Sequence, residues 1–356
     1  MCSVTCGDCR DRSFWVRNSG SLKRDLQSGE LERMKRRSGV LSVVCRWGLV
    51  VVMLVAPCHG WFDTGHHLVG ILAFDLLDGV QKETVGRILS AHPRFDEEFQ
   101  VPSGIQRGGF RNRWLLGRAS YWPDLIRGQE EWDRPTWHYQ LGAALTVGQR
   151  INVPPTPQGL PNNVSLQTTG LHVAQAFQYC RSVLADKNRR DADRAIAICW
   201  LAHLAGDSHQ PCHAGSLYYE GVFPEGDRGA NWLKLKNGSN LHAFWDGQFG
   251  SDLNWAALDE RAVQLRSTQA WKKTVVAAKN LDPMVWLQES VQFSRGAVYT
   301  DEVLAAVEAT RRSGQDRVPP MDLSPRYRQR ALEIAEQRVV LAARRLANVL
   351  QSDLAK

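Results

Sequence analysis

Two histidine–aspartate pairs carry the clearest chemical signal in this sequence of 356 residues. His203 precedes Asp207 by four residues, and His242 precedes Asp246 by the same spacing. Residues four apart on an α-helix lie on one face, so each pair can converge on one cation. Imidazole combined with carboxylate is a ligand set suited to zinc, whereas calcium and magnesium sites are built mainly from oxygen atoms. The repeated spacing therefore predicts a metal centre.

A single pair of this kind is also compatible with a solvated helix face or with a simple hydrogen bond. The neighbours of His203 argue against that interpretation, because the residues around it are apolar and include Leu201 and Leu204. Burying imidazole and carboxylate groups there is costly unless they are paired or bound to a metal. His138 and His213 are further candidate ligands, each with a weaker signal when taken alone.

The first 60 residues have the pattern of a leader. A basic stretch begins at Met34, an apolar run of about ten residues follows, and small residues precede Trp61. We therefore expect translation to start at Met34, and a signal peptide to be removed before Trp61, giving a secreted or periplasmic protein. The apolar run is shorter than the roughly 20 residues of a membrane-spanning helix. A lipid anchor on Cys58 is the alternative, which Pro57 immediately before it disfavours.

Cleavage at this position would make Trp61 the N-terminal residue. A free α-amino group has a pKa near ~8, so zinc can displace its proton and bind the nitrogen. His66 follows five residues later. Removal of the leader would thus complete a metal site.

Helical periodicity dominates the chain after residue 60, and no run of alternating strand residues is convincing. A Pro-rich loop at 154–161 and an irregular segment at 211–238 interrupt the pattern. We expect one mostly helical domain over residues 61–356. The helices are predicted over 66–89, 114–126, 169–184, 191–207, 241–249, 253–279, 283–299 and 325–354.

Charge and cysteine content say little about the substrate. The net charge is +7, but residues 61–356 hold 34 basic and 32 acidic side chains, so most of the excess lies in the leader. Five of the eight cysteines also lie there, which leaves Cys180, Cys199 and Cys212. A disulfide between Cys180 and Cys199 and buried free thiols both remain open.

Along nearly all of residues 61–356 the sequence resembles the zinc-dependent nucleases of the S1/P1 type. Two departures are an alanine in the usual Gly-Gly-Asn element, here Gly229-Ala230-Asn231, and Cys212 at a commonly aliphatic position. The matching motifs are Trp61 with Gly65-His66, Trp122-Pro123-Asp124, Trp137-His138-Tyr139, Gly206-Asp207-Ser208-His209-Gln210-Pro211 with His213, and Asn240-Leu241-His242 with Trp245-Asp246.

The resemblance implies three zinc ions. One would be held by Asp124, His138, His203 and Asp207, a second by His213, His242 and Asp246, and a third by the amine and carbonyl of Trp61, by His66 and by the other oxygen of Asp207. Asp207 would therefore bridge two ions. Asp124 is expected to orient the attacking water, and Arg127 and Asn231 to contact the phosphate.

The resemblance further implies an all-α fold with the three-zinc site in a cleft between helices. The expected activity is hydrolysis of single-stranded DNA and RNA to 5′-phosphate products, with removal of 3′-phosphates from nucleotides. We expect a monomer without stable membrane association.

Two other functions are compatible with such ligands. A zinc phospholipase C is disfavoured by the short step from Trp61 to His66 and by Asp246, where that enzyme would have Glu. A secreted, non-catalytic zinc-binding protein is disfavoured because structural sites prefer Cys ligands and closed shells of four. The inferred ligands contain no Cys, and the second zinc has only three protein ligands, which is not a closed shell.

Overall fold

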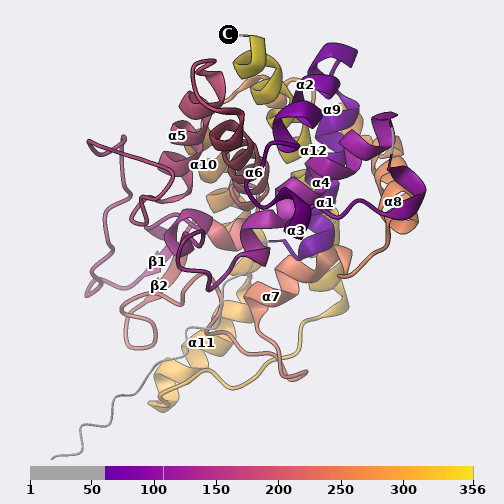
Figure 1. Ribbon diagram of the computed structural model, residues 1–356. Helices are drawn as coiled ribbons and strands as arrows, with labels where there is room; N and C mark the ends of the chain where they lie inside the picture. Colours follow the sequence, from indigo (N-terminus) through magenta and orange to yellow (C-terminus); the bar gives the residue numbers. More distant parts are fainter. Residues whose placement is uncertain (1–60, 107, 356) are drawn as a thin grey trace, which may run out of the picture. The chain divides into compact units, whose positions relative to one another are not determined.

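The computed structural model describes residues 61–106 and 108–355 (Figure 1). Helices make up most of this part of the chain, and one pair of short strands accompanies them. The predicted all-α, mostly helical class is confirmed. The predicted start at Met34 and the signal peptide within residues 1–60 lie outside the described residues.

Helix α6 (Asp191–Asp207) forms the centre of this fold (Figure 1). Every residue from Arg194 to Asp207 is buried, as expected of a helix that is apolar on all sides and therefore belongs to a core. The helices that pack against it include α1 (Asp63–Asp75), α4 (Gly108–Leu125), α5 (Val173–Ala185) and α12 (Pro325–Ala355). The sequence of α6 thus places His203 and Asp207 in the interior.

Two of the predicted helices are interrupted by capping residues. The helix expected over 66–89 is α1 followed by α2 (Gly79–Leu89), because Asp78 and Gln81 form a reciprocal capping box at 2.8 and 3.1 Å. The helix expected over 253–279 divides into α8 (Trp255–Ser267) and α9 (Gln269–Lys273), where Thr268 Oγ1 accepts from the N–H of Trp271. The remaining helices are α3 (Phe95–Glu98), α7 (Leu241–Asp246), α10 (Pro283–Phe293) and α11 (Asp301–Ser313).

The two strands were not predicted. β1 (Ala143–Val147) and β2 (Ser216–Tyr219) pair in parallel, with Leu145 opposite Leu217. They are too short to give a clear alternating pattern. Their pairing lies beside a hydrogen bond from the N–H of Gln140 to the carbonyl of His213, at 2.8 Å. The strand pair therefore fixes the segments that carry His138 and His213 side by side.

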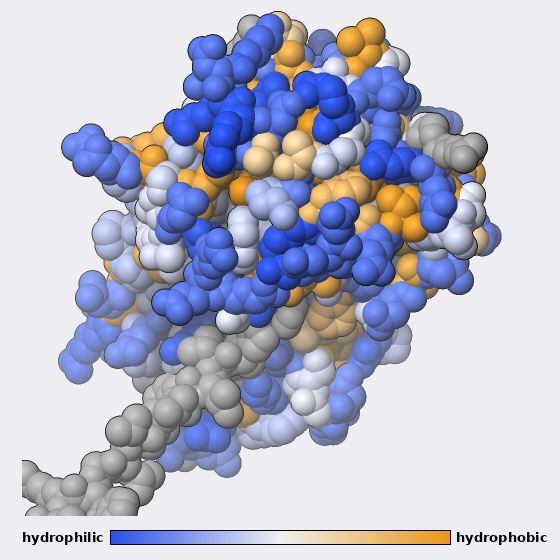
Figure 2. All heavy atoms as spheres, in the orientation of Figure 1, coloured by the Kyte–Doolittle hydropathy of each residue, from blue (hydrophilic) through white to orange (hydrophobic). Residues whose placement is uncertain are grey.

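Hydrophilic residues cover most of the face drawn in Figure 2, and the apolar side chains there form separate groups. Among the described residues, none of the helices combines the length and the apolar character needed to cross a bilayer.

Candidate metal centre

Asp124, His138, His203 and Asp207 converge in the interior from three separate segments. Asp124 lies in the last turn of α4, His138 ends a 3-10 turn (Pro135–His138), and His203 and Asp207 lie on α6. Oδ2 of Asp207 is 3.1 Å from Nε2 of His203 and 3.2 Å from Nδ1 of His138. Oδ1 of Asp124 is 3.8 Å from each of these nitrogens. The four side chains surround one buried point.

A second group gathers His213, His242 and Asp246. His242 and Asp246 lie one turn apart on α7, with 3.3 Å between Nε2 and Oδ2. His213 ends another 3-10 turn (Pro211–His213). Its Nε2 lies 3.1 Å from Nε2 of His242. The three buried side chains present ligand atoms within 4.8 Å of one another.

The geometry of this second group calls for a cation. Nδ1 of His242 lies 2.6 Å from the carbonyl oxygen of Gly229, and Nδ1 of His213 contacts the carbonyl oxygen of His138. A carbonyl can only accept, so both Nδ1 atoms donate, and in the neutral rings both Nε2 atoms carry lone pairs. Two lone pairs facing each other at 3.1 Å repel unless a second proton on one ring or a metal ion lies between them. The nitrogen and oxygen donors fit zinc.

His66 provides a third position, next to the first group. Its ring stacks on that of His203, with 3.9 Å between centroids, and its Nε2 lies 3.6 Å from Oδ1 of Asp207. Both ring nitrogens are buried without a hydrogen-bond partner among the described residues. A buried polar atom left unpaired in this way costs about 1–3 kcal/mol. His66, His203 and Asp207 form another group that could hold a metal ion.

Trp61 is fully buried beside His66. Its indole Nε1 donates to the carbonyl of Gly206 at 3.2 Å. Two glycines make room here: a Cβ on Gly65 would lie 2.5 Å from Cβ of Trp61, and a Cβ on Gly206 would lie 2.8 Å from Nδ1 of His66. The two glycines of the sequence motifs are therefore needed for close packing around Trp61 and His66.

Burial and neighbouring charges together set the protonation of these groups. It holds the pKa values of His66 and His138 well below their ordinary range, which favours the neutral, metal-binding imidazole. Burial also raises the pKa of Asp246 well above its usual value, although the hydrogen bond from Gln210 opposes this. For Asp207 burial acts in the same direction, but His203 and His213 outweigh it and lower the pKa. A bound cation would favour the ionised form of Asp246.

The two predicted phosphate-contacting residues lie in different settings. Arg127 is close to the first group, with Nε 3.2 Å and Nη2 3.1 Å from Oδ1 of Asp124. Asn231 lies in a partly exposed loop, where its Nδ2 donates to the carbonyl of Arg228 at 2.9 Å. This loop is joined to the second group through Gly229. The structure brings together all the predicted side-chain ligands and Arg127, and it places Asn231 one loop away.

Residues that hold the ligands in place were not identified from the sequence. Gln210 donates from Nε2 to Oδ1 of Asp246 at 2.5 Å, and the carbonyl of Ser120 accepts from Nδ1 of His203 at 2.8 Å. Such partners fix the orientation and tautomer of a metal ligand. Gln210 lies within the family motif that begins at Gly206, and its place in that motif was the signal that could have identified it. No sequence signal could have identified the carbonyl of Ser120.

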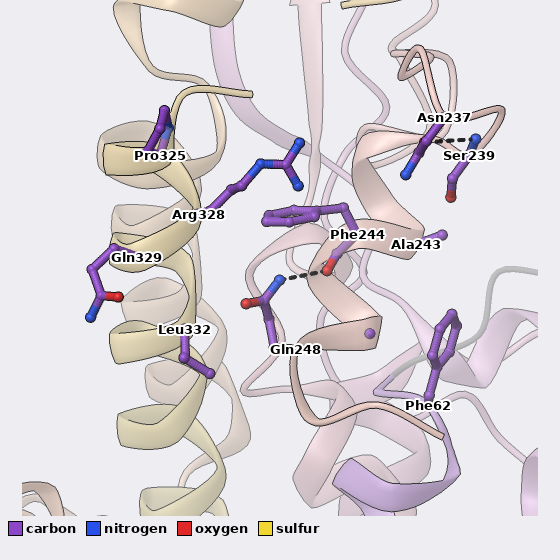
Figure 3. Close-up of a pocket in the computed structure, with 11 residues that line it drawn as sticks. Phe62, Asn237, Ser239, Ala243, Phe244, Gln248, Pro325, Arg328, Gln329 and Leu332 are labelled. Carbon is purple, nitrogen blue, oxygen red and sulfur yellow. Dashed lines mark hydrogen bonds between the residues drawn. The ribbon is translucent and has the colours of Figure 1, made fainter. Parts of the chain in front are cut away.

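A pocket of about 630 Å³ lies beside α7 and is separate from the groups of metal ligands (Figure 3). His242 and Asp246 occupy one face of this helix, while Ala243 and Phe244 line the pocket on another. Arg328, from α12, lies over the Phe244 ring at 5.6 Å (Figure 3). None of the nine predicted metal ligands lines this pocket.

Comparison with known proteins shows the family to which this chain belongs. The sequence profile of the S1/P1 nuclease family matches residues 61–355. The chain belongs to the S1/P1 nuclease family. Endonuclease 1 of Arabidopsis thaliana is 25% identical over 206 residues, which cover 56% of this chain and 57% of that protein. Endonuclease 5 of the same plant is 26% identical over 216 residues, covering 56% and 60%.

Endonuclease 2 of Arabidopsis thaliana matches over a longer stretch. It is 24% identical over 276 residues, or 69% of this chain and 82% of the relative. This S1/P1 family chain spans less than two thirds of the length of Endonuclease 1 and Endonuclease 5.

This member of the S1/P1 family is strained where it departs from the Gly-Gly-Asn element. Ala230 has a φ of 68°, and a Cβ on Gly229, itself at 60°, would lie 2.3 Å from the carbonyl oxygen of Cys212. Glycine is thus required at 229, while the alanine at 230 adopts a left-handed conformation that L-residues resist. Cys180, Cys199 and Cys212 are buried, and no disulfide joins any two of them in the described part of the chain.

Proposed function

We propose that this chain is a secreted zinc-dependent nuclease that hydrolyses single-stranded DNA and RNA to products with 5′-phosphate ends, and that it also removes 3′-phosphates from nucleotides. The observation that carries the proposal is the facing pair of Nε2 atoms on His213 and His242, 3.1 Å apart with Asp246 beside them. Membership of the S1/P1 family supports phosphodiester hydrolysis as the use of such a centre.

The proposed ligands form three sets, two of which share the carboxylate of Asp207. Asp207 presents Oδ2 to His203 and His138, and its Oδ1 lies 3.6 Å from His66. The third set also needs the carbonyl of Trp61 and its free α-amino group, and this amino group exists only after cleavage before Trp61. The sets are Asp124, His138, His203 and Asp207; His213, His242 and Asp246; and Trp61, His66 and Asp207.

Zinc ions bound at these positions would supply a deprotonated water at neutral pH and neutralise charge on the phosphate. The protein's own groups then orient the reaction. Asp124, held by Arg127 at 3.1 Å, would accept a hydrogen bond from the attacking water and so aim it. The guanidinium of Arg127 adds positive charge where the transition state accumulates negative charge. Asn231 supplies an amide for a phosphate oxygen.

The preference for single strands follows from burial. The side chains of His66, His138, His203 and Asp207 are fully buried. An unpaired, flexible backbone reaches such groups more easily than a stiff duplex, and its bases are free to stack on aromatic side chains. We expect the metal centre to act on single-stranded nucleic acid and on 3′-nucleotides.

One substrate panel tests the proposal. The mature chain, starting at Trp61 and supplied with zinc, is incubated with single-stranded DNA, single-stranded RNA, duplex DNA, a 3′-nucleotide and phosphatidylcholine. The expected result is rapid cleavage of both single strands to 5′-phosphate ends, release of phosphate from the 3′-nucleotide, and loss of all activity with a chelator. Cleavage of phosphatidylcholine alone would instead establish a phospholipase. Absence of hydrolysis throughout would leave a metal-binding protein without this activity.

A further inference from the structure

Arg228 and Trp232 are exposed on a loop, residues 227–232, beside the second ligand group. The Trp232 side chain is 43% exposed, and the other tryptophans in the described part of the chain are buried or partly buried. The guanidinium carbon of Arg228 lies 5.3 Å from the centre of its ring, and the buried ring of Phe223 packs at 6.2 Å. An exposed indole supported by a cation and a buried ring is a site for stacking.

The backbone of this loop is held in a strained conformation. Arg228, Gly229 and Ala230 have successive φ angles of 57°, 60° and 68°. Left-handed conformations are unfavourable for residues other than glycine, and such strain recurs at functional sites. The N–H of Gly229 donates to Oγ of Ser216 at 3.0 Å, and the N–H of Trp232 donates to the carbonyl of Asp227 at 3.2 Å. The loop is therefore a fixed surface.

The same loop is connected to the metal centre. The carbonyl of Gly229 accepts from Nδ1 of His242 at 2.6 Å. Trp232 is three residues further along, and three residues span at most roughly 11 Å. The loop thus orients a predicted metal ligand with its backbone while Arg228 and Trp232 project toward solvent within reach of a strand bound at the centre.

We propose that residues 227–232 form a docking platform for single-stranded nucleic acid, in which Trp232 stacks on an unpaired base and Arg228 pairs with a backbone phosphate beside the scissile one. This inference rests on the proposed function and adds the residues that recognise the strand. Every base has a π-face, so stacking on Trp232 tolerates any sequence. A guanidinium next to the ring contributes both charge and hydrogen bonds to phosphate. The platform favours strands over mononucleotides, because only a strand provides a second phosphate.

Steady-state kinetics on the mature, zinc-loaded enzyme test the platform. A thymidine hexanucleotide is the substrate, and the variants are Trp232→Ala, Trp232→Phe and Arg228→Ala. Trp232→Ala should raise KM about tenfold or more with kcat unchanged, whereas Trp232→Phe should retain most of the affinity because a ring remains. Arg228→Ala should raise KM and reduce the slope of log KM against log salt by about 1. Phe110→Ala is the matched control, since Phe110 is exposed near the start of α4, roughly 21 Å along the helix from Asp124.

A binding measurement gives a readout that does not depend on turnover. A phosphorothioate hexanucleotide that resists cleavage should quench the fluorescence of the wild type, and Trp232→Phe should remove most of that quenching. The platform would be overturned if the wild type cleaves the hexanucleotide and Trp232→Ala has the same KM as Phe110→Ala and the wild type. The proposed function would remain intact in that case. A wild type that neither cleaves nor binds the hexanucleotide would overturn the proposed function itself.

Discussion

Asp207 and His66 approach each other through one carboxylate oxygen: Oδ1 of Asp207 lies 3.6 Å from Nε2 of His66. The other oxygen, Oδ2, lies 3.1 Å from Nε2 of His203. Asp207 is the last residue of α6, whose apolar surface places it in the interior. One side chain therefore belongs to two candidate sites, and its removal should affect both.

Asp207→Ala should accordingly lose more than one zinc ion per chain, because the substitution removes a ligand from two sets at once. Elemental analysis of the purified protein measures this directly. Asp316→Ala, at an exposed position, is the control and should retain the wild-type content. Loss of a single ion in Asp207→Ala would show that the carboxylate serves one site only.

Gln210→Ala should weaken metal binding at the second group. The amide of Gln210 donates to Oδ1 of Asp246 at 2.5 Å, and removing such an orienting partner typically costs about 10–100-fold in metal affinity. Competition with a zinc-binding dye would show one ion released more readily than the others. Gln167→Ala, at an exposed position, provides the comparison. Unchanged affinity in Gln210→Ala would mean that Asp246 is held without it.

Glu289→Gln should destabilise the attachment of α12. Arg338 and Arg345 are buried, and both donate to the Glu289 carboxylate, at 2.9 and 2.7 Å. With a neutral amide, two buried cations lose their counter-charge, so the free energy of unfolding should fall by about 2 kcal/mol or more. Urea denaturation measures the change. Glu333→Gln, in an exposed ion pair with Arg330, should have little effect. Equal losses in the two variants would contradict this account.

Much of the site, but less of the fold, could be predicted from the sequence. His203 with Asp207 and His242 with Asp246 were recognisable because a helix brings residues four apart together, and that relation is local. The approach of His138 to His203, at 2.8 Å, depends on α4, α6 and an intervening loop, so only a family resemblance could suggest it.

The errors have physical causes as well. The break between α1 and α2 depends on a capping box at Asp78, which periodicity alone does not reveal. Helix α11 was missed, although it ends at Gly314 in a left-handed conformation, a usual helix stop. The strands β1 and β2 were missed because their pairing joins residues far apart in the chain.

Asp227 gives the protein a distinct pH dependence. Burial raises the pKa of its carboxyl to about 6, although hydrogen bonds from backbone N–H groups and from Tyr299 oppose this. The corresponding value in an unfolded chain is near ~3.9. Because the folded-state pKa is higher, the stabilising contribution is complete below about pH 4 and is lost as the pH rises through about 6.

Asp227→Asn cannot titrate at this position. The free energy of unfolding of the wild type, relative to that of the variant, should therefore fall by about 2 kcal/mol between pH 4 and pH 7. Urea denaturation of the two proteins at several pH values measures this difference. A constant difference across the range would show that the Asp227 carboxyl titrates as it does in water.

The zinc content of two forms of the chain tests the central claim most directly. The claim is that His and Asp side chains, completed by the amine of Trp61, form a three-ion centre. A chain beginning at Trp61 should bind about three zinc ions, whereas a chain with one extra glycine before Trp61 should lose about one, because an amide nitrogen has no available lone pair. Helical content by circular dichroism should be the same for both. Equal zinc content in the two forms, or about one ion in the mature chain, would contradict the account.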